Sequence, residues 1–189
     1  MTRPQISVVI PHGGNTPALQ RQLEALSNQS RLPDEVLISC NRPGSYHSVT
    51  SLLTTTAPDL PNVRLIDSSK SPGPSAARNA GWRACTANIV LFCDDDDVAD
   101  PHWVEVLSDG LEQHYLCSGA LEYAQLNPTR AGQFDAVDIP SINKFDHLPY
   151  GPTSNLGARI QVLEDTGGFD ENAACAEDID FCWRAQYLG

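Results

Sequence analysis

The stretch "NIVLFCDDDD", residues 88–97, joins an uninterrupted apolar run to four consecutive aspartates. Such a continuous apolar run is typical of a strand that is buried on both faces of a parallel sheet. Four adjacent carboxylates repel one another and favour disorder over a fold. Their position directly after the most apolar strand therefore indicates a site at the end of that strand, where a cation could neutralise them.

Strand-like and helix-like segments alternate around this stretch. Three further strands are predicted from apolar runs at residues 6–11, 35–39 and 63–66. Helices are predicted at residues 15–30, with Thr16 as the cap, at 75–85 and from Asp100-Pro101 onward. The alternation predicts an α/β fold, in which a mostly parallel, Rossmann-like central sheet is flanked by helices. Ligands of such sheets bind beyond the carboxyl ends of the strands, where the aspartates lie.

The second half of the chain shows weaker patterns. A strand is predicted within residues 116–126, followed by a long loop at 127–150. A short helix is predicted within 157–171, stopped by Gly167 and Gly168. Residues 176–189 predict a helix with an acidic start.

Composition limits the classes of protein to which the chain can belong. Its 189 residues suffice for one domain, and a net charge of −12 argues against a nucleic-acid partner, because phosphate backbones require Lys and Arg. The six cysteines lack metal-ligand spacing, so most are predicted to be small buried residues in a reducing compartment. No signal peptide or membrane-spanning run is found, so we expect a cytoplasmic location, with membrane association through other parts or partners left open.

Asp94 and Asp96 are the predicted metal ligands. Mg²⁺ and Mn²⁺ prefer hard oxygen ligands and typically combine one or two carboxylates with the phosphates of a substrate. An Asp-x-Asp pair at a strand end therefore suggests a metal that bridges the protein and a diphosphate. Asp97 and Asp100 can instead cap the following helix or complement its dipole.

A second acidic cluster, Glu177, Asp178 and Asp180, lies near the C-terminus. The helix dipole alone favours acids at a helix start, and a general base near the metal site is the functional alternative. The segment "SPGPSAARNAG", residues 71–81, places a Pro/Gly turn before a helix whose N-terminus can face a phosphate. Within it, Arg78 can pair with a phosphate or a base, or form a surface ion pair.

Four segments together resemble family 2 glycosyltransferases, inverting enzymes of the GT-A fold that use nucleotide-diphosphate sugars. The segments are "ISVVIPHGGNTPALQRQLEALSNQS" (6–30), "GPSAARNAGWRAC" (73–85), "IVLFCDDDDVADP" (89–101) and "GGFDENAACAEDIDFCWR" (167–184). They occur in the family's order and span almost the whole chain. The resemblance implies a hexosyltransferase-type enzyme that uses Mn²⁺ or Mg²⁺ and transfers to a sugar, a lipid-linked sugar or another hydroxyl acceptor.

The resemblance also implies roles for the donor-binding residues. Asp96, with Asp94, would hold the metal on the donor diphosphate, and Asp95 would lie near the ribose. The nucleotide would be lined by Pro11, His12 and Arg78.

Catalytic roles follow from the same resemblance. Asp178 would be the base that deprotonates the acceptor hydroxyl, with Glu177 beside it. Residues 151–155, "GPTSN", would lie near the donor sugar and the acceptor.

Two features depart from the family pattern. After the second strand the family usually has a pair of acids, of which one recognises the nucleobase, and here Cys40 and Asn41 occupy these places. The Asn41 amide can still bond a base edge, but its donor pattern differs from that of a carboxylate, so uridine is not assumed. Relatives commonly continue beyond the predicted base, whereas this sequence stops at Gly189, so we expect a C-terminally truncated acceptor side.

We therefore expect one glycosyltransferase domain at 1–189, with a nucleotide-binding half at 1–98 and an acceptor and catalytic half at 99–189. Two alternatives stay open. One is a nucleotidyltransferase of similar topology, although "PHGGNTPA" (11–18) lacks the Gly-rich, Arg-containing loop of that class. The other is a degenerate module that binds nucleotide or cation without turnover.

Overall fold

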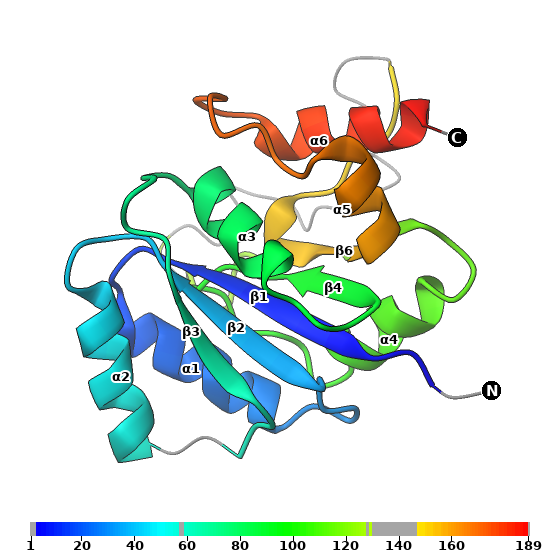
Figure 1. The fold of residues 1–189 in the computed structure, drawn as a ribbon. Coiled ribbons are helices and arrows are strands. Elements are labelled where there is room, and N and C mark those ends of the chain that lie inside the picture. Colours follow the sequence, from blue (N-terminus) through cyan, green and yellow to red (C-terminus); the bar gives the residue numbers. More distant parts are fainter. Residues whose placement is uncertain (1–2, 57–58, 128, 130–146, 189) are drawn as a thin grey trace.

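The computed structural model describes residues 3–56, 59–127, 129 and 147–188. Within these residues, six strands form one sheet in the spatial order β3-β2-β1-β4-β6-β5 (Figure 1). The strands are β1 (Ile6–His12), β2 (Glu35–Cys40), β3 (Val63–Asp67), β4 (Ile89–Phe92), β5 (Leu116–Ser118) and β6 (Leu156–Arg159). The first four are mutually parallel, and β6 pairs antiparallel with both β4 and β5. The predicted mostly parallel α/β sheet is confirmed.

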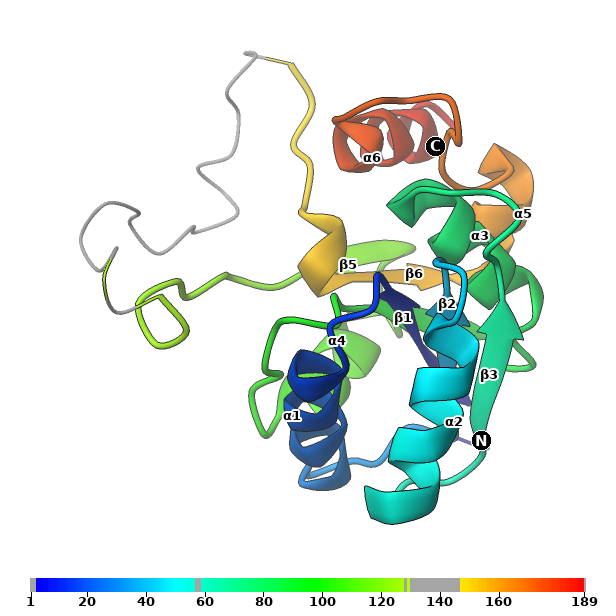
Figure 2. The ribbon, with the colours of Figure 1, turned by 90° about the vertical axis from the view of Figure 1, so that its left-hand side faces the viewer.

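Helices cover both faces of this sheet (Figure 1, Figure 2). One face carries α1 (Thr16–Ser27), α2 (Ser45–Thr56) and α4 (Trp103–Gly110). The opposite face carries α3 (Pro74–Arg83), α5 (Ile160–Thr166) and α6 (Glu177–Tyr187). A 3₁₀ turn, η3 (Thr153–Asn155), leads directly into β6.

Two hydrophobic cores, one on each side of the sheet, explain the apolar runs of the strands. In β1, Val8 and Ile10 belong to the core beneath α1, whereas Val9 belongs to the core that includes Trp82 of α3. All three valine and isoleucine side chains are fully buried. A strand that is covered on both faces needs apolar residues at every position, so it shows no alternation in its sequence.

A glycine brings α3 close to the sheet. A Cβ added to Gly81 would lie 2.3 Å from Val9 Cγ1 and 2.9 Å from Ser39 Oγ, so a larger side chain has no room there. This approach places Arg78, one turn earlier on α3, within reach of Asp94 at the end of β4.

Arg184 fastens α6 to the end of α5. Its Nη1 donates to the carbonyl of Thr166 at 2.8 Å, and its Nη2 donates to the carbonyl of Gly168 at 2.7 Å. Gly167 and Gly168 have φ angles of +78° and +82°, a left-handed conformation that ends α5 as predicted. This turn sets the direction in which the chain enters α6.

Several element boundaries differ from the predictions. Asn15, and not Thr16, caps α1, because its side chain accepts a hydrogen bond from the Ala18 amide. The predicted strand within 116–126 is limited to β5, and most of the predicted loop at 127–150 lies outside the described residues.

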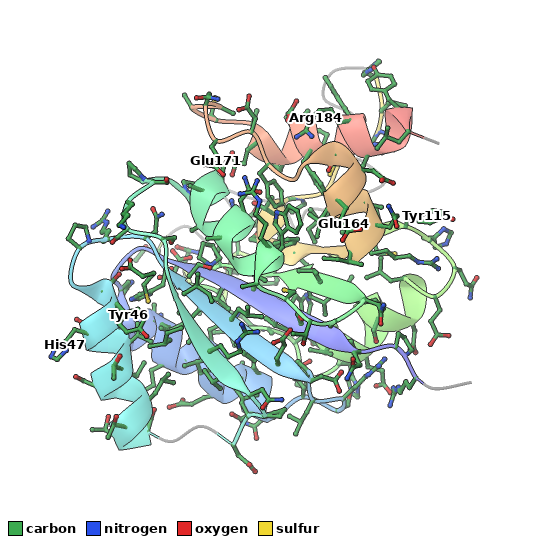
Figure 3. The ribbon with its side chains drawn as sticks, viewed as in Figure 1. Tyr46, His47, Tyr115, Glu164, Glu171 and Arg184 are labelled. Carbon is green, nitrogen blue, oxygen red and sulfur yellow. The ribbon has the colours of Figure 1, made fainter. Side chains whose placement is uncertain are left out.

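Two elements were missing from the sequence prediction. The helix α2 is rich in Ser and Thr and buries only Val49 and Leu52 among its apolar side chains, so its helical periodicity is weak. His47 projects outward from this helix (Figure 3). Residues 157–159 of β6 were assigned to the start of the following helix, because the strand sequence Leu-Gly-Ala-Arg contains no β-branched or aromatic residue.

All six cysteines are free thiols. Three are buried, namely Cys40, Cys93 and Cys182. Burial raises the pKa of Cys40 to about 11 and that of Cys182 to about 12, so these thiols stay protonated and unreactive at neutral pH. In the described part of the chain, no helix combines the length and the apolarity needed to cross a bilayer.

Candidate active site

A cleft of about 780 Å³ opens at the carboxyl ends of β1, β2 and β4. Its walls come from the loops after these strands, the start of α3, the turn η3 and the start of α6. It is lined by all nine residues that the sequence predicted for the site, namely Pro11, His12, Asn41, Arg78, Asp94, Asp95, Asp96, Glu177 and Asp178. The fold therefore brings these side chains into one place, while their individual roles stay predictions.

Arg78 connects the two acidic clusters of the cleft. Its Nη2 lies 2.7 Å from Asp94 Oδ1, and its Nη1 lies 3.1 Å from Glu177 Oε1. Only 4% of the Arg78 side chain is exposed, so the guanidinium neutralises both carboxylates where water screens them little. The bridge links the loop after β4 to the start of α6.

His12 and Asp95 join the end of β1 to the loop after β4. The Nδ1 atom of His12 lies 2.6 Å from Asp95 Oδ2, and the same oxygen accepts a hydrogen bond from the Gly13 amide at 3.1 Å. His12 is fully buried, and its Nε2 has no hydrogen-bond partner among the described residues. Asp95 is thus held by the end of β1.

The aspartate cluster carries unbalanced negative charge. Burial, followed by repulsion from Asp95 and Asp94, raises the pKa of Asp96. Burial and the other three aspartates raise the pKa of Asp97 to about 7. Burial and mutual repulsion thus disfavour the ionised forms of Asp96 and Asp97, and a nearby divalent cation would favour them.

The donor set fits a metal that also binds a substrate. Among the described residues, no group of three or more His, Cys, Asp or Glu side chains is arranged to hold a metal ion without other ligands. Mg²⁺ and Mn²⁺ sites often use one or two carboxylates and complete the coordination with substrate phosphates and water. Asp94 and Asp96 match that smaller requirement.

Asp178 lies in the first turn of α6, which begins directly after Ala176, whose φ of +62° is left-handed. Burial is the main cause that raises the pKa of Asp178, and repulsion from Glu177 acts in the same direction. The hydrogen bond from the Ile179 amide to Asp178 Oδ1, at 2.8 Å, opposes this shift. A half-buried carboxylate with a raised pKa is a stronger proton acceptor than an ordinary aspartate.

Asp180, the third acid of this cluster, has a structural partner and does not line the cleft. Its Oδ2 lies 2.6 Å from Nη2 of Arg184, one turn later on α6. The sequence left a structural and a functional interpretation open for this cluster, and for Asp180 the structural one is supported.

At the opposite end of the cleft, Asn41 follows β2. Its Nδ2 donates to the carbonyls of Ser68 at 3.2 Å and Ser71 at 2.8 Å. Its Oδ1 accepts a hydrogen bond from the Gly73 amide at 2.7 Å. The amide therefore holds the loop that leads into α3.

Sequence reasoning missed several residues of the cleft. These are chiefly loop residues without a local pattern, namely Gly13, Arg42, Leu121, Glu122, Tyr123, Leu126 and Asn127. Arg42 could have been noticed, because it lies two residues after the end of β2, a strand that the sequence predicted. Of residues 151–155, Pro152, Thr153 and Ser154 line the cleft, whereas Asn155 is bonded to the indole of Trp103 at 2.8 Å.

Comparison with known sequences identifies relatives. A model described as "Glycosyl transferase family 2" matches residues 7–165. The "Uncharacterized glycosyltransferase YwdF" of Bacillus subtilis strain 168 is 34% identical over 189 residues, which covers 96% of this chain and 68% of that protein. The "Pre-mycofactocin glycosyltransferase" of Mycobacterium tuberculosis H37Rv is 30% identical over 137 residues, which covers 65% of this chain but only 28% of that protein.

Solved structures share the fold. The mannosyltransferase PcManGT from Pyrobaculum calidifontis, in complex with GDP-Man and Mn²⁺, aligns with a TM-score of 0.71 at 19% identity and covers 100% of this chain. S. aureus TarS 1–349 in complex with UDP-GlcNAc aligns with the same TM-score of 0.71 and covers 96% of this chain. This chain spans 54% and 53% of their respective lengths. The family match over most of the sequence and the shared architecture establish that the chain belongs to glycosyl transferase family 2 and has the GT-A fold.

Proposed function

We propose that this chain is a metal-dependent, inverting glycosyltransferase domain, which moves a sugar from a nucleotide-diphosphate sugar to a hydroxyl acceptor. The observation that carries the proposal is that two acidic groups line one cleft. They are the aspartates after β4 and the acid pair at the start of α6. One acidic group suits a diphosphate with its cation, and the other suits a base for the acceptor. Residues 1–98 would then bind the nucleotide, and residues 99–189 would supply the base and the acceptor side.

Asp94 and Asp96 would hold Mn²⁺ or Mg²⁺. When bound, the metal neutralises the negative charge that develops on the leaving nucleoside diphosphate. Arg78 keeps Asp94 in place through its 2.7 Å ion pair, and the pair of Asp95 with His12 fixes the same loop from the other side. The relative PcManGT was crystallised with GDP-Man and Mn²⁺, which supports a divalent cation and a nucleotide sugar for this chain as well.

Asp178 would act as the general base. Its raised pKa lets it accept the proton of an acceptor hydroxyl, whose oxygen then attacks the anomeric carbon of the donor sugar. The bond from that carbon to the diphosphate breaks as the new bond forms on the opposite face, so the anomeric configuration inverts. Glu177, held 3.1 Å from Arg78, keeps the start of α6 at the cleft.

The first test is nucleotide binding to the full chain. UDP, GDP, dTDP and CDP are each added with MnCl₂ or with EDTA, and the unfolding temperature is measured. A ligand that binds only the folded state raises that temperature, so we expect a shift for at least one nucleotide with Mn²⁺ and a smaller shift with EDTA. Transfer is then followed as release of nucleoside diphosphate from the matching nucleotide sugar, with water as the surrogate acceptor.

The outcomes separate the proposal from its alternatives. Binding followed by donor turnover supports a transferase. Binding without turnover of any nucleotide sugar favours the degenerate binding module, and release of pyrophosphate from a nucleoside triphosphate and a sugar phosphate favours a nucleotidyltransferase. No shift with any nucleotide contradicts the proposal.

A further inference from the structure

We propose that Arg42 recognises the nucleobase in this chain, and that Asn41 is a positioning residue which holds the wall of the base site. The inference rests on the proposed nucleotide-sugar donor. It follows that a base with two adjacent hydrogen-bond acceptors, guanine or cytosine, is preferred over uracil and thymine.

The placement of the base follows from the shape of the donor. With the diphosphate at Asp94 and Asp96 and the sugar toward Asp178, the nucleoside would extend along the carboxyl ends of β1 and β2, to the end of the cleft at the β2 loop. That end is formed by the loops after β2 and before α3, which contribute Asn41, Arg42 and residues 72–74. These two loops contribute no carboxylate to the cleft, so the base edge meets no acidic side chain from them.

The hydrogen bonds of Asn41 already commit its amide to the protein. Both Nδ2 hydrogens have acceptors, the carbonyls of Ser68 and Ser71, and Oδ1 accepts from the Gly73 amide. An amide has two donor hydrogens, so Asn41 has no donor left for a ligand. Its role is to connect the end of β2 to the loop 68–73, which forms one wall of this end of the cleft.

The donor groups of Arg42, unlike those of Asn41, are available to a ligand. It is exposed, it lines the cleft, and its guanidinium forms no hydrogen bond or ion pair within the described residues. Its Cδ lies beside Gly14, where an added Cβ would be 3.8 Å away, so the side chain extends from the β2 loop toward the β1 loop. Arg78, the other arginine of the cleft, is 4% exposed and paired with two carboxylates. The unpaired donors at this end therefore belong to Arg42.

The chemistry of a guanidinium selects among bases. Arginine has donors only, arranged in a planar fork that binds two adjacent acceptors. Guanine offers O6 and N7 side by side, and cytosine offers N3 and O2. In uracil and thymine the N3–H donor separates the two carbonyl oxygens, so only one of them can be bonded without placing a donor against a donor. A bidentate contact of this kind discriminates against the wrong base by about fivefold or more.

The test is a matrix of four nucleotides and five proteins, measured as dissociation constants by calorimetry with MnCl₂. The nucleotides are GDP, CDP, UDP and dTDP, and the proteins are wild type, Arg42→Gln, Asn41→Ala, Asn41→Asp and the control Arg3→Gln. Arg3 is exposed at the opposite end of β1, so its substitution makes the same change in net charge far from the cleft. Unfolding curves without nucleotide confirm that each variant folds.

We expect wild type and Arg3→Gln to bind GDP or CDP at least about fivefold more tightly than UDP and dTDP. Arg42→Gln should remove most of this preference. Asn41→Ala should lower the affinity for all four nucleotides by a similar factor, because the wall formed by the loop 68–73 loses its support whichever base is bound. Asn41→Asp should do the same without a gain for UDP, because its carboxylate faces the carbonyls of Ser68 and Ser71.

Three results would overturn the inference while leaving the proposed function in place. They are a preference of wild type for UDP or dTDP, an equal loss for all nucleotides in Arg42→Gln, and a selective gain of UDP affinity in Asn41→Asp. If wild type binds none of the four, the proposed function and this inference both fail. If the Asn41 variants do not fold, the comparison of wild type with Arg42→Gln still decides the base preference.

Discussion

Asn79 is hydrogen-bonded to both main-chain polar groups of Phe169. Its Nδ2 donates to the Phe169 carbonyl at 2.8 Å, and its Oδ1 accepts from the Phe169 amide at 3.0 Å. The same Oδ1 accepts from the Trp82 indole at 2.9 Å, and Asn79 is 1% exposed. A single side chain thus fastens α3 to the turn that leads to α6, and with it the two halves of the cleft.

Replacing Asn79 by Ala should therefore destabilise the protein. The substitution leaves the amide and carbonyl of Phe169 and the indole of Trp82 buried without partners, at a cost of about 3 kcal/mol in the free energy of unfolding. For a chain of this size, the unfolding temperature should fall by about 6–12 °C. Asn172→Ala is the matched control, because Asn172 is exposed and, among the residues that the structure describes, bonds only to nearby Asp170. Equal stability of the two variants would contradict this account.

Gly81→Ala should also destabilise, although alanine is the better helix former. Propensity alone would stabilise the helix by up to about 1 kcal/mol. The added methyl group would meet Val9 Cγ1 at 2.3 Å, and such overpacking costs about 1–3 kcal/mol. Chemical denaturation of Gly81→Ala, Val9→Ala and the double variant tests the cause. The clash predicts that the double variant is more stable than the sum of the single effects; simple additivity would argue against it.

Asp178→Asn should separate donor binding from transfer. The asparagine is nearly isosteric but cannot accept a proton, so nucleotide affinity should stay within about twofold while donor turnover falls by at least about a hundredfold. Calorimetry gives the first quantity, and nucleoside diphosphate release gives the second. Asp180→Asn is the control, because Asp180 pairs with Arg184 outside the cleft. Undiminished turnover in Asp178→Asn would remove this residue as the base.

On the acid side of the pH–activity profile, half of the activity should be lost at a pH above the pKa of an ordinary aspartate, which is about 3.9. Burial and Glu177 raise the pKa of Asp178, and the base works only when it is ionised, so activity is lost as the pH falls through that raised value. Glu177→Gln removes a repelling charge and should move this midpoint to lower pH. Nucleotide affinity is measured over the same range, since the pKa of Asp96 is raised too. A midpoint that is unmoved in Glu177→Gln would contradict the assignment.

Asp96→Asn should abolish the part of nucleotide affinity that depends on Mn²⁺. A neutral amide is a poorer ligand for a hard cation, so the ratio of affinities with Mn²⁺ and with EDTA should approach one. Asp100→Asn is the control, because Asp100 bonds the His102 amide before α4 and does not line the cleft. Retention of full metal dependence in Asp96→Asn would mean that the metal is held elsewhere.

The sequence was informative wherever a property was local. The continuous apolar runs of β1 and β4 predicted buried parallel strands, and the position of the aspartates after β4 predicted the edge of the sheet at which the cleft opens. The short strand β6 could not be predicted, because its pairing partner β4 comes from much earlier in the chain. The same holds for Arg78 and Glu177, whose ion pair exists only after α3 and α6 have packed.

The hydrogen bonds of Asn41 and Asn79 could not be predicted from the sequence either. Asn79 belongs to a segment that resembles a family motif, and Asn41 stands where the chain departs from the family pattern. Neither sequence position indicates that the amide is hydrogen-bonded to backbone groups. Side-chain hydrogen bonds to a distant main chain leave no periodic signal in the sequence, whereas hydrophobic burial does.

The insertion of β6 between β4 and β5 has a consequence for biosynthesis. When the ribosome has released the first hundred or so residues, β1 to β4 can already pair, but the outer side of β4 has no neighbour until Leu156–Arg159 emerge. During that interval an apolar strand with free amide and carbonyl groups is open to pairing with another nascent chain. The yield of folded protein should therefore depend on chaperones that protect this edge of β4. Slower translation of the segment between β4 and β6 would prolong the time for which the edge is exposed.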